Sequence, residues 1–227
     1  MAIRDIIMAA AGSSGPPPPP GPVSIASGTR TPTLGTGAQS PFPAAGWTAL
    51  QSSSVDDASR FWSFGGVTFT INNTAYTGAY VGSNQYVTFG SGSSAYSSLS
   101  ASNPPYNKIH VCGADNSMQR VSYRNYTGFS RLRMEGRAAT SGTPGSPNIV
   151  WEMTFVDPSL TPAGVQYVEV LVGTQLRTTG QGGVASTNAF YVNTARLAAN
   201  TSYVFTGNAT GTSWTASVGA HLDGVPY

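Results

Sequence analysis

Side chains able to do acid–base or metal chemistry are few in this sequence. His110 and His221 are the only histidines, and Cys112 is the only cysteine. His110 and Cys112 stand two residues apart in an apolar run, so a β-strand would place both on one face, as a Cys/His dyad or part of a metal site. Zinc takes four ligands, however, and nothing else in the sequence supplies the remainder. The pattern therefore favours a histidine buried in the core or at an interface.

Three glutamates raise a second kind of chemistry, because two facing carboxylates can hydrolyse a glycosidic bond. Glu135, Glu152 and Glu169 each fall in a run typical of a strand. Arginines such as Arg131 and Arg133 lie nearby, and cross-strand ion pairs are the favoured interpretation. No phosphate-binding loop, nucleophile elbow or metalloprotease motif occurs. We predict that the protein is not an enzyme and has no cofactor, with a polysaccharide depolymerase as the second alternative.

An adjacent acidic pair, Asp56-Asp57, is the one cation candidate in the sequence. Ca²⁺ binds hard oxygen ligands, and backbone carbonyls with a later aspartate would add to this pair. The favoured alternative is a turn in which Asp57 bonds its own backbone.

Aromatic residues in loops suggest a recognition surface. Tyr96, Tyr106 and Tyr126 lie in stretches rich in Ser, Asn and Gly. Tyrosines in such loops suit adaptable recognition and would stack on sugars of a host surface glycan. Ordinary loop packing or subunit contacts are the alternative.

The composition is that of an extracellular or virion β-protein. Only 9% of the residues are charged, against about 25% in typical soluble domains. A net charge of +2 is too small to indicate a nucleic-acid partner. Lys108 is the only lysine among eleven basic residues, and arginine suits interfaces. No apolar run approaches the length of a membrane span, so we expect no membrane insertion.

The N-terminal region divides into a docking peptide, residues 1–15, and a Pro/Gly-rich extended linker, residues 16–46. Ile3, Ile6, Ile7 and Ala10 fall on one face of a short predicted helix. A helix this short is marginal in water, so its apolar face must pack against a partner or against the chain's own β-domain. Five consecutive prolines follow and form a stiff polyproline spacer.

Residues 47–227 are predicted to form an all-β domain, an antiparallel β-sandwich or jelly roll of about 10–12 strands. Gly65-Gly66 predicts a hairpin joining the runs on either side, and Asn72-Asn73 predicts a turn. Residues 124–128, which end in Gly128, predict a hairpin between the runs 118–123 and 129–135. The predicted strands are 61–64, 67–71, 75–81, 85–89, 108–112, 118–123, 129–135, 148–156, 165–172, 190–192, 202–206 and 213–218.

The stretch from Asp56-Asp57 through Phe61-Trp-Ser-Phe-Gly-Gly-Val-Thr-Phe to Tyr76-Thr-Gly-Ala-Tyr-Val-Gly-Ser-Asn-Gln-Tyr-Val-Thr-Phe-Gly90 resembles the nidogen-like β-sandwich of surface and adhesive proteins. Gln85 stands where that family usually has a turn glycine. The resemblance covers about forty residues and implies a sandwich, with little to say about activity.

The opening Met-Ala-Ile-Arg-Asp-Ile-Ile-Met-Ala-Ala-Ala-Gly resembles the short leader of tail and fibre proteins of tailed bacteriophages. In that class the leader docks different distal domains onto one platform. The resemblance implies a virion location, other virion proteins as partners of the N-terminal peptide, and a homo-oligomer, with a trimer as the first expectation. We therefore predict a tail, tail-fibre or capsid-decoration component, with a carbohydrate-binding adhesin module as the alternative.

Overall fold

The computed structural model describes residues 21–33, 46–95, 105–138, 147–176, 180–187, 189–194 and 196–225, without the side chains of 181 and 194. Several predictions fall outside these ranges: the N-terminal helix with Ile3, Ile6, Ile7 and Ala10, the proline run, and Tyr96.

The described part of the chain is all-β, as predicted: 56% of its residues are in strands, and it has no helix of seven or more residues. Two 3₁₀ turns, η1 (Pro158–Leu160) and η2 (Pro162–Gly164), lie between β11 and β12. No helix among the described residues has the length and apolarity needed to cross a membrane.

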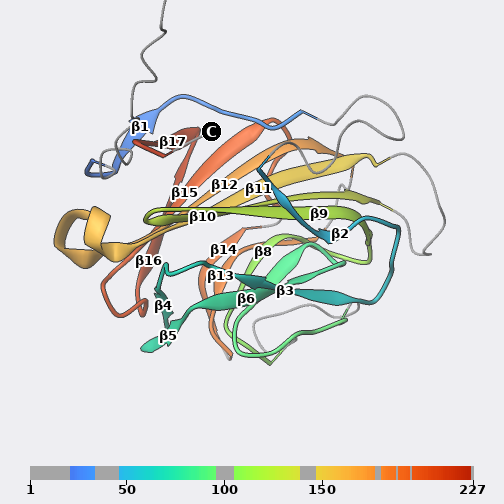
Figure 1. Cartoon of the computed structure of the whole chain (residues 1–227), viewed down its shortest axis with the longest axis horizontal. Coiled ribbons are helices and arrows are strands. Elements are labelled where there is room, and N and C mark those ends of the chain that lie inside the picture. Colours follow the sequence, from blue (N-terminus) through green and yellow to red (C-terminus); the bar gives the residue numbers. More distant parts are fainter. Residues whose placement is uncertain are drawn as a thin grey trace, which may run out of the picture.

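Four antiparallel sheets make up the structure, two large and two small (Figure 1). The larger sheet has the order β16 (Trp214–Val218), β15 (Thr201–Gly207), β12 (Gln166–Gln175), β11 (Ile149–Val156), β10 (Phe129–Arg137), β9 (Ser117–Tyr126), β2 (Thr48–Gln51). The smaller sheet has the order β14 (Phe190–Thr194), β13 (Gln181–Ala185), β8 (Lys108–Gly113), β7 (Tyr86–Thr88), β6 (Gly78–Gly82), β3 (Ser59–Ser63). Two-stranded sheets pair β1 (Ser24–Ser27) with β17 (Ala220–Asp223) and β4 (Phe69–Ile71) with β5 (Thr74–Tyr76).

One hydrophobic core lies between the two large sheets. It contains Leu132 and Met153 from the larger sheet and Val81 and Ile109 from the smaller one, all fully buried. In β8 and β10 these core residues alternate with side chains on the outer faces, as a period of two requires. Figure 1 shows the two layers one above the other, with β1 and β17 above the larger sheet.

Buried tryptophans connect the two layers by hydrogen bonds as well as by packing. The indole Nε1–H of Trp151 donates to Gln85 Oε1 at 2.7 Å, from the larger sheet to the smaller. Trp62 Nε1–H donates to Ser130 Oγ at 2.9 Å in the opposite direction. Gln85 has a φ of 63°, so its backbone adopts the left-handed conformation that a turn glycine would supply, while its side chain holds Trp151.

The sheet order combines local and long-range strand pairs. Neighbouring strands are often consecutive in sequence, as in β9 to β12 and β6 to β8. Elsewhere the chain passes to the other sheet and returns beside an earlier strand: β12 pairs with β15, while β13 and β14 between them lie in the smaller sheet.

The predicted Gly65-Gly66 hairpin is wrong. Both glycines have positive φ, 62° and 103°, and reverse the chain, but β3 pairs with β6 through five residue pairs. The run after Gly66 instead forms the β4–β5 ribbon, closed by the predicted turn at Asn72 and Asn73, whose φ values are 52° and 60°. A turn signal shows where the chain reverses and does not show which later strand becomes the partner.

Other strand predictions are confirmed with small changes of boundary, including β8, the β9–β10 hairpin, β11, β12 and β15. The predicted strand 75–81 is split into β5 and β6. Strands β1, β2, β13 and β17 were not predicted. Strand β1 lies in the range 16–46 that the sequence indicated as linker, and it pairs with β17 near the other end of the chain.

Residues 22–33, which we call the arm, cross the outer face of the larger sheet. Val23 packs into a second hydrophobic cluster and its N–H donates to Leu160 O at 2.9 Å. The members of this cluster are Val23, Phe129, Val156, Tyr167, Val204, Ala220, Leu222 and Val225. Further along the arm, a Cβ added at Gly173 of β12 would overlap the carbonyl oxygen of Pro32. The arm is therefore packed against the β-domain and is not a free linker.

Candidate functional site

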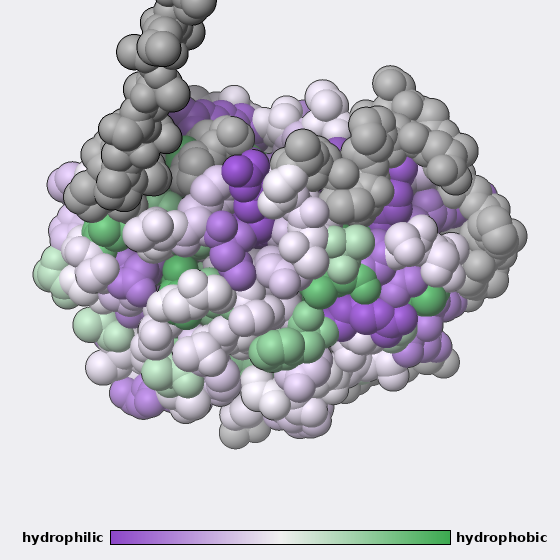
Figure 2. Space-filling model, in the orientation of Figure 1, coloured by the Kyte–Doolittle hydropathy of each residue, from purple (hydrophilic) through white to green (hydrophobic). Residues whose placement is uncertain are grey.

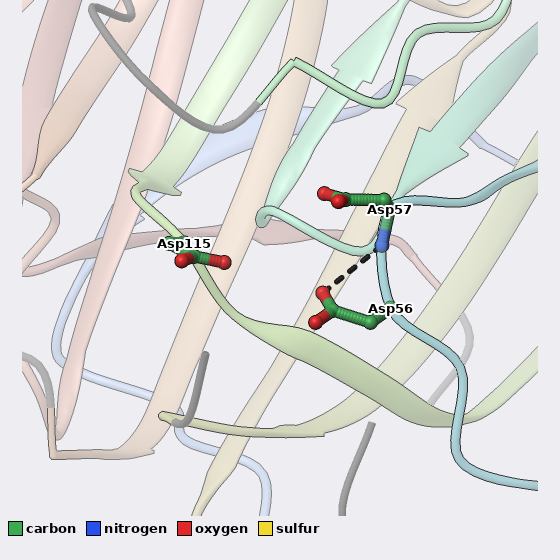
Figure 3. A group of neighbouring side chains, drawn as sticks. All are labelled: Asp56, Asp57 and Asp115. Atoms are coloured by element: carbon green, nitrogen blue, oxygen red, sulfur yellow. Dashed lines mark hydrogen bonds between the residues drawn. The ribbon is translucent and has the colours of Figure 1, made fainter. Parts of the chain in front are cut away.

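Three aspartates come together where two turns meet at one end of the sheets. Asp56 and Asp57 lie between β2 and β3, and Asp115 lies between β8 and β9. One carboxylate oxygen from each lies within 4.8 Å of the others. Figure 3 shows the three side chains approaching one another from these two segments. No other group of three His, Cys, Asp or Glu side chains in the described ranges has metal-binding spacing.

The turn at Asp56-Asp57 has the backbone hydrogen bond that the sequence suggested, but with the roles exchanged. Asp56 Oδ1 accepts from Asp57 N–H at 2.9 Å, so the bonding carboxylate belongs to Asp56 and not to Asp57. Asp57 has a φ of 44°, and its side chain is exposed, whereas Asp56 and Asp115 are half-buried.

Asn84, which is fully buried, fixes the two turns relative to each other. Its Nδ2 lies 3.4 Å from Asp57 Oδ1 and 3.1 Å from Ala95 O. Its Oδ1 accepts from Asn116 N–H at 2.8 Å, next to Asp115. One amide thus connects the turns that carry the aspartates. Sequence reasoning singled out neither Asn84 nor Asp115, although Asp115 follows a correctly predicted strand.

Chemically, this arrangement is a partial site for a hard cation. Ca²⁺ takes 6–8 oxygen ligands, and the three carboxylates would supply some of them with water completing the shell. Without a cation, three carboxylates at this spacing repel one another. The charge of Asp57 also acts on Tyr86, whose pKa is raised to about 12 mainly by burial and further by this carboxylate.

His110 and Cys112 lie on one face of β8, as the spacing predicted, but form no site with each other. Both are fully buried. Neither ring nitrogen of His110 has a hydrogen-bond partner among the described residues, and its ring lies between those of Tyr86 and Phe190, at centroid distances of 5.8 and 5.9 Å. Burial, reinforced by the charge of Lys108, lowers the pKa of His110 to about 3. His110 is a neutral buried ring.

The glutamates lie on the outer face of the larger sheet, and two of them form ion pairs with arginines. Glu135 pairs with Arg120 and with Arg133, the latter at 2.6 Å. Glu152 pairs with Arg131 and with Arg133, the latter at 3.0 Å. We call these five residues the charge ladder. The predicted pairing is confirmed for both glutamates.

Glu169 is used differently. Its Oε1 accepts from Leu222 N–H at 2.8 Å, which joins β12 to β17.

Of the predicted receptor-contact tyrosines, two are described, and both are half-buried. Tyr126 is half-buried against the second hydrophobic cluster, and the guanidinium of Arg124 lies 4.8 Å from its ring centroid. Tyr106 is half-buried beside the buried Asn107. The more exposed aromatic residue is Phe61 on β3, which sequence reasoning did not select; 52% of it is exposed.

No protein-family model matches this chain, and no curated protein or solved structure is significantly similar to it.

Proposed function

We propose that this protein is a bacteriophage virion structural protein, a tail, tail-fibre or capsid-decoration component. In this proposal the N-terminal peptide, residues 1–15, binds other virion proteins, and the two layers form a β-sandwich that serves in assembly or host attachment. The resemblance of residues 56–90 to nidogen-like sandwiches of adhesive proteins supports the same use.

The observation that supports this proposal is the way in which the arm is packed against the β-domain. Residues 24–27 pair with residues 220–223, Val23 is buried in the second cluster, and the arm then crosses the larger sheet. The segment before residue 22 therefore starts from a point held by the fold. A partner that gripped that segment would hold the whole β-domain in a defined position, which is what an attachment peptide requires.

The test is incorporation into particles of the bacteriophage that carries the gene. We expect a variant lacking residues 1–20, which keeps the arm and β1, to fold with an unchanged thermal midpoint and to be lost from particles. In the full chain, Ile6→Asp on the predicted docking face should reduce incorporation, whereas Asp5→Asn on the opposite face should not. Wild-type incorporation of the truncated protein would overturn the proposal.

Oligomeric state is a separate part of the proposal. We expect a homotrimer, because fibres and decorations commonly use three-fold symmetry. Sedimentation equilibrium of the intact chain checks this, and a monomer at micromolar concentration would contradict it.

A second proposal, glycan recognition, is favoured by one surface feature. Phe61 and Tyr80 face each other across β3 and β6 with ring centroids 5.2 Å apart, and Phe61 is largely exposed at the sheet edge. Figure 2 shows the apolar residues on the face that it draws as separate patches. A glycan array probed with wild-type protein and Phe61→Ala tests this, and no binding by either would remove the idea.

The depolymerase alternative has weaker support. Two of the three glutamates that suggested it are held by arginines in the charge ladder.

A further inference from the structure

His221 lies in β17 where that strand pairs with β1 of the arm, and it has an oxygen acceptor at each ring nitrogen. Nδ1 is 2.8 Å from the carbonyl oxygen of Gly28, which belongs to the arm. Nε2 is 3.2 Å from Oδ1 of Asp223, two residues further along β17. A carbonyl and an ionised carboxylate accept hydrogen bonds and donate none. Both contacts are therefore hydrogen bonds at the same time only when both ring nitrogens carry a proton.

The surroundings of His221 add two charged groups, Arg30 and Glu169. Arg30 of the arm lies 3.3 Å from the same Oδ1 of Asp223. On β12, beneath β17, Glu169 accepts from the adjacent Leu222 N–H. From β15, Ser202 contributes an uncharged hydroxyl that donates to Gly28 O at 3.5 Å. Among the described residues, the charged groups here are thus the two carboxylates and Arg30.

The backbone fixes the position of the arm's acceptor. Gly28 has a φ of 119°, which favours glycine, and its N–H donates to Gly219 O at 2.9 Å. The His221 side chain is 11% exposed and that of Asp223 is 53% exposed. The His221 ring is thus enclosed by the protein, whereas the Asp223 carboxylate stays in contact with water.

We propose that His221 is a pH-sensitive latch that holds the arm on β17. The imidazolium bridges Gly28 O and Asp223 Oδ1. The neutral ring has a single N–H and can donate to only one of these oxygens. At the other contact, the unprotonated ring nitrogen then faces an oxygen, and both atoms are acceptors. Histidine changes charge between about pH 5 and 8. The arm is therefore held more tightly at pH 5.5 than at pH 8, whatever the protein's biological role, so the proposed function is not needed for this inference.

The test is amide hydrogen exchange of the intact chain at pH 5.5 and pH 8, corrected for the intrinsic pH dependence of exchange. Peptides covering residues 22–33 are compared with peptides covering β11 as an internal reference. We expect the arm to be about fivefold better protected at the lower pH, the ratio that a partly exposed charged contact supplies. Equal protection of the arm at the two pH values would overturn the latch.

Two variants separate the latch from a general effect of pH. His221→Gln keeps an amide donor for Gly28 O but does not titrate, so its arm should lose the pH dependence. Asp223→Asn keeps the histidine and offers an amide that donates to an unprotonated Nε2, so its arm should remain protected at pH 8. A fivefold change retained in Asp223→Asn would also overturn the proposal, because the carboxylate would then play no part.

Ring nitrogen NMR shifts supply a direct reading that does not depend on arm stability. The chain has two histidines, and His110 serves as the control that stays neutral over this range because burial lowers its pKa to about 3. We expect the His221 signal to show both nitrogens protonated at pH 5.5. A neutral His221 ring at pH 5.5 would contradict the latch.

Discussion

On the outer face of the larger sheet, ionisable side chains are buried as pairs, whereas on the outer face of the smaller sheet burial acts against their charge. Glu135 and Glu152 are 1% and 7% exposed, and each contacts two arginines. Lys108 and His110 are fully buried on β8, and burial is the main cause that lowers the pKa of both, to about 8 and about 3. These four groups are thus handled in two ways: the glutamates are paired with arginines, whereas burial opposes the charged forms of Lys108 and His110.

The difference has consequences for stability. Removing one member of a buried ion pair leaves a charge behind, which costs several kcal/mol. A basic group whose pKa is lowered by burial does not affect stability at a pH where it is neutral in both the folded and the unfolded chain. It lowers stability at any pH where the unfolded chain binds the proton and the folded chain does not. The larger sheet should therefore be sensitive to mutation, and the smaller sheet to pH.

The largest expected effect is in the charge ladder. Glu152→Gln removes the carboxylate that Arg131 and Arg133 share, and we expect the free energy of unfolding to fall by about 3 kcal/mol. Urea denaturation at pH 7 measures it. Asp223→Asn is the comparison for an exposed carboxylate, which contacts Arg30 and His221, and about 0.5–1 kcal/mol is expected there. Equal costs for the two variants would end the contrast between paired and exposed carboxylates.

Lowering the pH should destabilise the protein through His110. The pKa of His110 is about 3 in the folded chain against an ordinary 6.5, so the unfolded chain binds the proton first as pH falls through 6.5. Between pH 7 and pH 4.5 the wild type should lose about 2–3 kcal/mol more stability than His110→Phe. Denaturation of both proteins across this range is the measurement. Parallel pH profiles would show that His110 is not held neutral.

Raising the pH should stabilise the protein through Lys108. Its pKa is about 8 in the fold against an ordinary 10.5, so its full penalty is present below pH 8 and is relieved as pH rises. We expect the wild type to gain about 2 kcal/mol between pH 8 and pH 10 relative to Lys108→Met. The scan stops at pH 10, because the raised pKa of Tyr86 makes tyrosine ionisation favour the unfolded chain above it. No relative gain would mean that Lys108 is solvated.

The smallest effect concerns the aspartate cluster, where one carboxylate oxygen of each aspartate lies within 4.8 Å of the others. In metal-free buffer, Asp115→Asn removes repulsion from Asp56 and Asp57, a contribution of about 0.5 kcal/mol for charges in contact with water. Saturating Ca²⁺ should raise the thermal midpoint of the wild type and leave that of Asp115→Asn unchanged. The same response of both proteins to Ca²⁺ would remove the cluster as a cation site.

Local pattern predicted much of the fold. Strands β8 to β12 were found from alternation, and the β9–β10 hairpin from the Gly128 turn, where φ is 79°. Strand β1 was missed because it is four residues long, has one half-buried apolar residue, and pairs with a segment almost two hundred residues away. The periodicity of a short stretch of sequence does not indicate a pairing partner that lies so far along the chain.

The candidate sites divide in the same way. Pairing of Glu135 and Glu152 with arginines was predicted, because neighbouring strands place them opposite one another. Asp115 was not singled out, because it meets Asp56 and Asp57 only through the packing of two distant turns. Phe61 was missed because alternation shows that it faces away from Trp62 and does not show that β3 is an edge strand.

The most direct test that the arm is fixed to the β-domain is the addition of a single methyl group where the two meet. Gly173→Ala places a Cβ against the carbonyl of Pro32, whereas Gly21→Ala meets nothing within 4 Å and is the control. Hydrogen exchange should show residues 22–33 of Gly173→Ala at least about tenfold less protected, with β8 of the other large sheet protected as in the wild type and Gly21→Ala unchanged. Unchanged protection of the arm in Gly173→Ala would contradict the packing of the arm on the larger sheet, and with it the fixed origin of the N-terminal segment.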